Sequence, residues 1–129
     1  MPYRTLRIKR VYDAPEPEDG MRVLVDRLWP RGLSREKAAV DRWMKEIAPS
    51  DGLRRWYSHD RARYDEFRTR YRAELNERGT AVLELLSAAL SGSVTLLYSS
   101  RDTDINNAVV LRDYIEERMR ESRSAGSSL

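Results

Sequence analysis

Residues 23–33 of the chain read VLVDRLWPRGL, and this stretch decides the predicted fold. Its first three residues are apolar, which is typical of a strand buried in a parallel sheet. A loop with a carboxylate, two guanidiniums and an indole follows, because Pro30 and Gly32 break the strand. Open α/β sheets bind ligands outside the carboxyl ends of their strands. The stretch therefore predicts a ligand site, and its arginines favour an anion.

Other segments complete the predicted sheet. Residues 6–12 alternate apolar and basic side chains, which is typical of a strand with one solvent-exposed face. Residues 21–25 predict a more central strand, and residues 94–98 (VTLLY) form the clearest buried strand. We therefore expect a small single-domain α/β protein with a parallel or mixed sheet flanked by helices on both faces, a Rossmann-like three-layer arrangement. If the strands at Val23 and Val94 are parallel neighbours, their exit loops open at one edge.

Glycine and proline residues, helix-capping residues and apolar side chains at helical spacing predict the positions of the helices. Residues 41–48 favour a short helix followed by a strand-like segment. A long helix covers residues 61–77 and ends at Gly79, and the last helix begins at a cap formed by Asp102 or Asp104. The residues expected to face the core are Tyr64, Phe67, Tyr71 and Leu75 on the long helix and Ala108, Leu111, Ile115 and Met119 on the last one.

Length and composition bound the class of protein. The chain has 129 residues, enough for one domain, which we expect over residues 1–121 with a disordered polar tail over 122–129. No stretch approaches the roughly 20 apolar residues of a membrane span, and the first residues lack a signal peptide's apolar segment. The chain has no cysteine, which excludes disulfides and thiolate chemistry. These features predict a cytoplasmic protein.

The charge of the chain is large but nearly balanced. The chain has 24 Lys and Arg residues and 21 Asp and Glu residues, which gives a net charge of +3. This near balance predicts a solvated surface with many ion pairs. Arginine outnumbers lysine by 21 to 3, and its planar fork suits phosphate and carboxylate groups. The expected partner is a small anionic ligand. The alternative is nucleic acid bound by the arginines of residues 63–72.

The loop after residue 25 supplies the first candidate site residues. In the functional interpretation Arg27 and Arg31 clamp an anion, Trp29 forms a flat wall, and Asp26 orients an arginine or acts as a base. In the structural interpretation Asp26 is held in a buried ion pair with an arginine, and Trp29 fills the core beneath the loop. For Trp29 we favour the structural role, and for Arg31 the functional one.

The second candidate loop holds the single histidine of the chain. His59 precedes a helix, whose dipole favours the neutral imidazole, and Asp60 could fix its tautomer for general base catalysis. Alternatively, His59 bonds to a loop carbonyl and Asp60 caps the helix. With one histidine and no cysteine, no metal site is expected. No cofactor is expected either, because nothing in the sequence marks a redox or covalent cofactor.

The third candidate loop follows the strand at residues 94–98. Ser99, Arg101 and Asp102 come between that strand and a helix, the position of a phosphate cradle. Asn106 and Asn107 could present amides to a ligand or only complete the cap of that helix. No glycine-rich phosphate fingerprint is present, and serine catalysis is not expected. Asp102 could instead face Arg27 across the crevice.

Several of these segments together resemble a known family. The chain resembles the YeaO-like branch of the DUF488 family, a bacterial and archaeal group with a domain of unknown function. The resemblance covers roughly residues 4–115 and implies a compact α/β domain that brings the three loops together. The segments that carry it are RVYD (10–13), Asp19-Gly20, residues 23–33, Ala48-Pro49-Ser50, His59-Asp60, residues 94–98, Asp102 and Asn106.

Two functions remain open from the sequence. The first is an uncharacterised α/β protein whose arginine-rich crevice binds a nucleotide or a phosphate- or carboxylate-bearing metabolite. Hydrolytic or nucleotide-base chemistry would then use Asp26, His59 and Asp60. The alternative is a non-catalytic, nucleic-acid-associated or regulatory binding protein.

Overall fold

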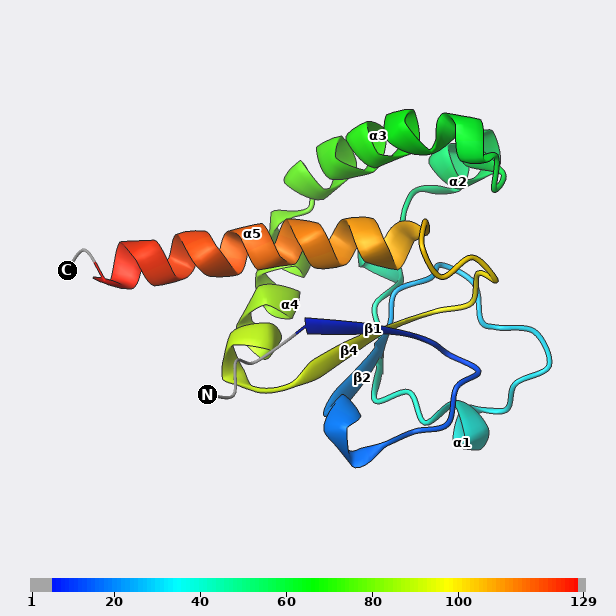
Figure 1. Cartoon of the computed structure of the whole chain (residues 1–129), viewed down its shortest axis with the longest axis horizontal. Coiled ribbons are helices and arrows are strands. Elements are labelled where there is room, and N and C mark those ends of the chain that lie inside the picture. Colours follow the sequence, from blue (N-terminus) through cyan, green and yellow to red (C-terminus); the bar gives the residue numbers. More distant parts are fainter. Residues whose placement is uncertain (1–5, 128–129) are drawn as a thin grey trace.

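The computed structural model describes residues 6–127, with side chains described through residue 123. Within this range the chain forms a four-stranded parallel sheet in the order β1-β4-β2-β3 (Figure 1). The predicted α/β class is therefore confirmed, and β4 lies at the centre with β2, as its largely apolar sequence indicates. The strands are β1 (Leu6–Arg10), β2 (Met21–Leu24), β3 (Arg42–Trp43) and β4 (Val94–Tyr98).

Helices connect the strands. The described α-helices are α1 (Arg35–Ala38), α2 (Asp51–Tyr57), α3 (Tyr64–Asn76), α4 (Gly79–Ser91) and α5 (Asn107–Ser127), and the short 3₁₀ helices are η1 (Pro17–Asp19), η2 (Lys45–Ile47) and η3 (Arg61–Arg63). Ser50 caps α2 because its side chain accepts a hydrogen bond from Leu53 N. The apolar stripes predicted on α3 and α5 are buried as expected.

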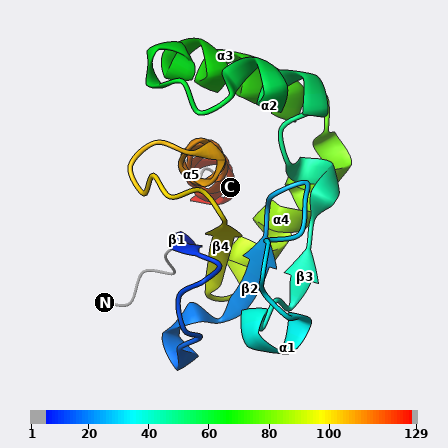
Figure 2. The ribbon, with the colours of Figure 1, turned by 90° about the vertical axis from the view of Figure 1, so that its right-hand side faces the viewer.

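The two faces of the sheet are covered differently. The main core lies on the face covered by α4 and α5, and α3 packs beyond α5 (Figures 1 and 2). A smaller core around Leu24 and Leu97 lies on the opposite face, where α1 and the loop after β2 cover it (Figure 2). Helices therefore lie around the sheet as predicted, but the second face has a loop and short helices rather than long ones.

Three local predictions differ from the structure. In residues 41–48 the strand β3 comes first and the 3₁₀ helix η2 follows, the reverse of the predicted order. Gly79 does not end α3 but begins α4, because Glu77 and Arg78 already make the turn between them. Helix α5 continues to Ser127 where composition predicts a disordered tail from residue 122, and residues 128–129 lie outside the described range.

A buried ion cluster holds the second face together. Asp19 is 2% exposed and accepts hydrogen bonds from Arg22 Nη1 at 2.7 Å and Lys9 Nζ at 3.1 Å. Thr95 in β4 donates to the Asp19 carbonyl at 2.8 Å. Burial alone would raise the pKa of Asp19, but hydrogen bonds from the Glu16 backbone, Arg22 and Lys9 outweigh it and lower the pKa.

Candidate functional site

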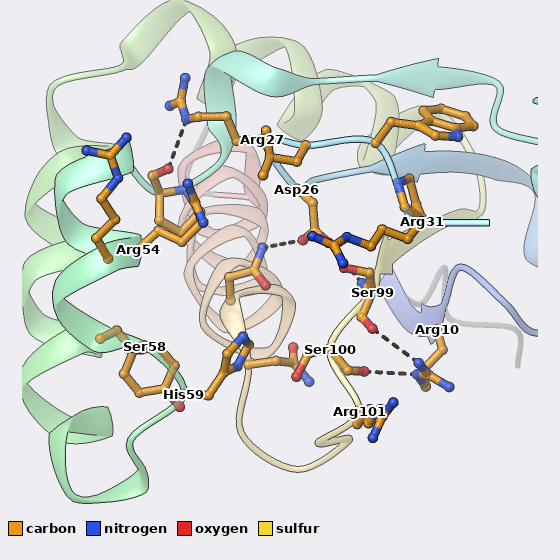
Figure 3. A pocket seen from close by; sticks show the side chains of 18 of the residues that line it. Arg10, Asp26, Arg27, Arg31, Arg54, Ser58, His59, Ser99, Ser100 and Arg101 are labelled. Atoms are coloured by element: carbon orange, nitrogen blue, oxygen red, sulfur yellow. Dashed lines mark hydrogen bonds between the residues drawn. The ribbon is translucent and has the colours of Figure 1, made fainter. Parts of the chain in front are cut away.

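An open pocket of about 920 Å³ lies at the carboxyl edge of the sheet, where the exit loops of β2 and β4 meet α2 (Figure 3). Because β2 and β4 are parallel neighbours, these loops open at the same edge, as the sequence predicts. The described residues that line it are Arg10, Tyr12, Asp26, Arg27, Leu28, Trp29, Pro30, Arg31, Pro49, Arg54, Arg55, Tyr57, Ser58, His59, Phe67, Ser99, Ser100, Arg101, Asn106 and Asn107.

Asp26 is a cross-link between three elements. Its Oδ2 accepts hydrogen bonds from Ser99 N at 2.9 Å and Ser99 Oγ at 2.7 Å, and its Oδ1 accepts one from Asn107 Nδ2 at 3.1 Å. The carboxylate thus joins the ends of β2 and β4 to the start of α5 (Figure 3). No arginine lies within ion-pair distance of Asp26 among the described residues. Both oxygens of the carboxylate therefore already serve as acceptors within the fold.

Two arginines of the pocket are fixed by backbone carbonyls. Arg10 donates from Nε to Ser100 O at 2.9 Å and from Nη2 to Ser99 O at 3.1 Å. Arg27 donates from Nε to Pro49 O at 3.2 Å and from Nη2 to Ala48 O at 3.4 Å. Neutral carbonyls orient a guanidinium without cancelling its charge, so both positions stay positive.

Three other arginines of the pocket have exposed side chains without partners. Arg31, Arg55 and Arg101 make no side-chain hydrogen bond or ion pair with another described residue. The backbone at Arg31 is nevertheless held in place, because Tyr12 Oη donates to Arg31 O at 3.0 Å. Gly32 follows at φ 72°, a left-handed conformation that favours glycine and turns the loop.

Trp29 lies between the pocket and the smaller core. Its Nε1 donates to Leu33 O at 2.7 Å, and its ring meets that of Trp43 edge to face with centroids 5.4 Å apart. The indole packs against the smaller core while one side lines the pocket. These contacts agree with the structural interpretation, and a role of Trp29 as a wall for a ligand stays a prediction.

The structure places His59 at the pocket but directs Asp60 elsewhere. His59 is exposed, lines the pocket and lies 6.1 Å from the ring of Tyr57. Asp60 Oδ1 accepts from Ala62 N at 3.0 Å and so caps η3, the structural alternative for this residue. No hydrogen bond joins Asp60 to His59 within the described residues, so they do not form a base and its orienting carboxylate.

The loop after β4 is organised by its own side chains. Asp102 Oδ1 accepts hydrogen bonds from Asp104 N and Ile105 N, and these backbone bonds hold the pKa of Asp102 below its usual value. Its Oδ2 pairs with Arg61, not with Arg27, and Asp102 is absent from the described pocket lining. Ser99 and Arg101 do line the pocket.

The cap of the last helix differs from the prediction. Asn106, rather than Asp102 or Asp104, caps α5, because its Oδ1 accepts from Val109 N at 3.0 Å. The prediction was wrong because Asp102 caps the turn before the helix instead. Asn106 lines the pocket but is 3% exposed, and its amide also donates to Asp102 O.

Sequence reasoning missed several pocket residues. Arg10 is the last residue of β1, and since β1 is parallel to β4, its position at this edge follows from the topology. Arg54, Arg55 and Tyr57 come from α2, whose placement over the pocket depends on tertiary packing and leaves no signal in the sequence.

Other classes of site receive no support from the described residues. Within residues 6–127 no group of three His, Asp or Glu side chains could hold a metal ion. No described helix is both long and apolar enough to cross a membrane.

The fold and pocket define the class of this protein: a small α/β domain with an arginine-lined pocket at the carboxyl edge of a parallel sheet. The chain belongs to the DUF488 family, since residues 5–129 match the family model described as the inactive DUF488-N3 subclade.

Curated relatives support the same assignment. The chain is 44% identical over 110 residues to uncharacterized protein YeaO of Escherichia coli, a match that covers 85% of this chain and 96% of that protein. It is 40% identical over 113 residues to uncharacterized proteins Mb3100c of Mycobacterium bovis and Rv3073c of Mycobacterium tuberculosis, covering 88% of this chain and 95% of each relative. The predicted YeaO-like membership is confirmed. No solved structure matches the chain.

Proposed function

We propose that the protein binds a small anionic ligand, a nucleotide or a phosphate- or carboxylate-bearing metabolite, in the pocket at the sheet edge. The observation that carries the proposal is the charge of the described lining. It includes six arginines against one carboxylate, Asp26, whose oxygens already accept hydrogen bonds from Ser99 and Asn107. Guanidiniums grouped in a pocket attract anions and can bind phosphate or carboxylate through paired hydrogen bonds.

Binding without catalysis is the form of this function that the site supports best. Asp26 acts as a structural acceptor, and His59 lacks the orienting carboxylate that Asp60 would have provided. The family model that matches the chain is itself described as an inactive subclade. Of the three residues expected to carry proton transfer, Asp26 and His59 therefore shape the pocket, and Asp60 caps η3.

The arginines on the exposed face of α3 already have carboxylate partners, and this favours a small ligand over nucleic acid. Arg68 pairs with Asp65 at 3.1 Å, Arg70 pairs with Glu66, and Arg72 pairs with Glu117 at 2.9 Å. Exposed arginines that already have carboxylate partners lose much of their attraction for a phosphate backbone. Among the pocket arginines, by contrast, Arg27 and Arg54 share the single carboxylate of Asp51, and the other four have no carboxylate partner among the described residues.

Isothermal titration calorimetry with inorganic phosphate, pyrophosphate and adenosine monophosphate tests the proposal. We expect at least one probe to bind the wild type and Arg31→Ala to weaken that binding roughly tenfold, the loss of about 1.4 kcal/mol expected for a charge-assisted contact. Arg120→Ala is the matched control, because it removes an exposed arginine of α5 that does not line the pocket. The proposal fails if no probe binds, or if both variants bind as tightly as the wild type.

A further inference from the structure

Five of the six arginines that line the pocket belong to two groups, one at α2 and one at the sheet edge. The first, the α2 group, consists of Arg27, Arg54 and Arg55. The second, the sheet-edge group, consists of Arg10 and Arg101, while the Arg31 side chain reaches between the two groups toward Asp26 (Figure 3). Figure 3 shows Arg27 and Arg54 beside α2 on one side of the pocket, and Arg10 and Arg101 on the other side beyond Ser99.

Each group combines an anchored arginine with a free one. In the sheet-edge group Arg10 is fixed by the carbonyls of residues 99 and 100, and Arg101 has no side-chain partner among the described residues. In the α2 group Arg27 is fixed by the carbonyls of residues 48 and 49, and Arg55 is without a partner in the same range. This repeated arrangement provides two separate places for an anionic group.

Carboxylates do not neutralise either group. Asp51 lies 3.4 Å from Arg54 Nη2 and 3.8 Å from Arg27 Nε, so one carboxylate is shared within a group of three guanidiniums. In the sheet-edge group no member forms an ion pair with a described residue. Both groups therefore keep a net positive charge that a ligand can balance.

Apolar side chains line the same pocket. Tyr57 stacks on Phe67 with centroids 4.4 Å apart and an interplanar angle of 27°. Tyr57 is 8% exposed, yet its hydroxyl makes no hydrogen bond with a described residue and is not sealed from solvent. Leu28 adds a side chain that is 59% exposed. These residues can cover a flat apolar body and offer it one phenolic hydroxyl.

The size of the pocket also exceeds what a simple anion requires. Its 920 Å³ lies near the upper end of the roughly 300–1,000 Å³ typical of pockets for drug-sized organic ligands. An inorganic phosphate would reach one arginine group and leave the other group and the apolar wall in contact with water.

We infer that the ligand is an organic molecule with two acidic groups joined by a flat apolar body, one acidic group at each arginine group. This inference rests on the proposed function and specifies its ligand class. It requires both ends of the pocket to contribute to binding, whereas anion binding alone requires only one.

Calorimetry with three probes of increasing complexity tests the inference: inorganic phosphate, phenyl phosphate and 4-carboxyphenyl phosphate. We expect affinity to rise at each step, by about tenfold when the second acidic group is added. Arg55→Ala and Arg101→Ala each remove one exposed, unpaired arginine from a different group, with Arg120→Ala as the control. Each should weaken 4-carboxyphenyl phosphate binding about tenfold, while only one should weaken phenyl phosphate binding.

Leu28→Ser tests the apolar wall separately, because an exposed leucine can be replaced without loss of the core. It should weaken both ring-bearing probes and leave inorganic phosphate binding unchanged. The inference is overturned if phenyl phosphate binds as tightly as 4-carboxyphenyl phosphate, or if only one of the two arginine variants weakens the latter. In that case, phosphate binding that depends on Arg31 leaves the proposed function intact. If no probe binds, both the inference and the proposed function fail.

Discussion

Replacement of Asp26 by alanine should destabilise the protein strongly. The substitution removes the acceptor of three hydrogen bonds, from Ser99 N, Ser99 Oγ and Asn107 Nδ2, at 2.7–3.1 Å. A hydrogen bond to a charged group contributes about 1.5–3 kcal/mol, and we take about 1 kcal/mol for each because water can reach this half-buried site. The expected loss is roughly 3 kcal/mol, a large share of the roughly 5–15 kcal/mol that stabilises a typical domain.

Urea denaturation and thermal unfolding measure this loss. For a chain of this length, a loss of that size lowers Tm by roughly 10 °C. Asp13→Ala is the control, because Asp13 is exposed and its side chain makes no hydrogen bond with a described residue. That variant should change the free energy of unfolding by less than about 0.5 kcal/mol.

A double-mutant cycle separates the cross-link from other effects of the substitution. Asp26→Ala and Ser99→Ala remove the two partners of the same contact, so their effects should be non-additive by about 1 kcal/mol. An Asp26→Ala variant as stable as the wild type would refute the structural role. The structural role would also be refuted if the losses of unfolding free energy from the two substitutions were additive.

Two further predictions concern stability. Since the pKa of Asp19 is lowered in the fold, the carboxylate contributes its full stabilisation above its unfolded pKa and loses it as pH falls below that value. Asp19→Asn should therefore weaken the fall in the free energy of unfolding at acid pH. An unchanged fall at acid pH would contradict this prediction. Ser58 adopts a left-handed φ of 46° at the exposed end of α2. Ser58→Gly should therefore raise stability by about 0.5–1 kcal/mol in urea denaturation, while Ser124→Gly, within α5, should lower it.

The parts of the fold that the sequence predicts are those with strong local signals. Residues 23–25 are all apolar and residues 94–98 are apolar apart from Thr95, and short apolar runs of this kind between turn signals are typical of buried strands. The strand β3 has two residues, Arg42 and Trp43, and its pairing with β2 rather than any periodicity makes it a strand. The order of β3 and η2 therefore could not be predicted from local pattern.

The candidate site was predictable at the level of loops but not of contacts. Parallel strands bring the loops after β2 and β4 together, and the sequence identifies both loops. The partners of Asp26 lie 73 and 81 residues away in the chain, at Ser99 and Asn107, so only the fold reveals that its carboxylate is occupied. Asp19 likewise lies in a loop rich in Pro and acidic residues, and nothing local indicates its burial beneath Lys9 and Arg22.

The way the chain distributes its carboxylates argues that the charge of the pocket serves binding. The chain has 21 acidic residues, and on α3 they pair with the arginines beside them. At the pocket, neutral carbonyls hold Arg10 and Arg27, and Asp51 is the one described carboxylate within ion-pair distance of a lining arginine, so much of the repulsion between like charges stays in place. Such repulsion lowers stability unless an anion relieves it. Removal of one free guanidinium, as in Arg31→Ala, should therefore leave the unliganded protein at least as stable while it weakens anion binding, a combination that a purely structural arginine would not produce.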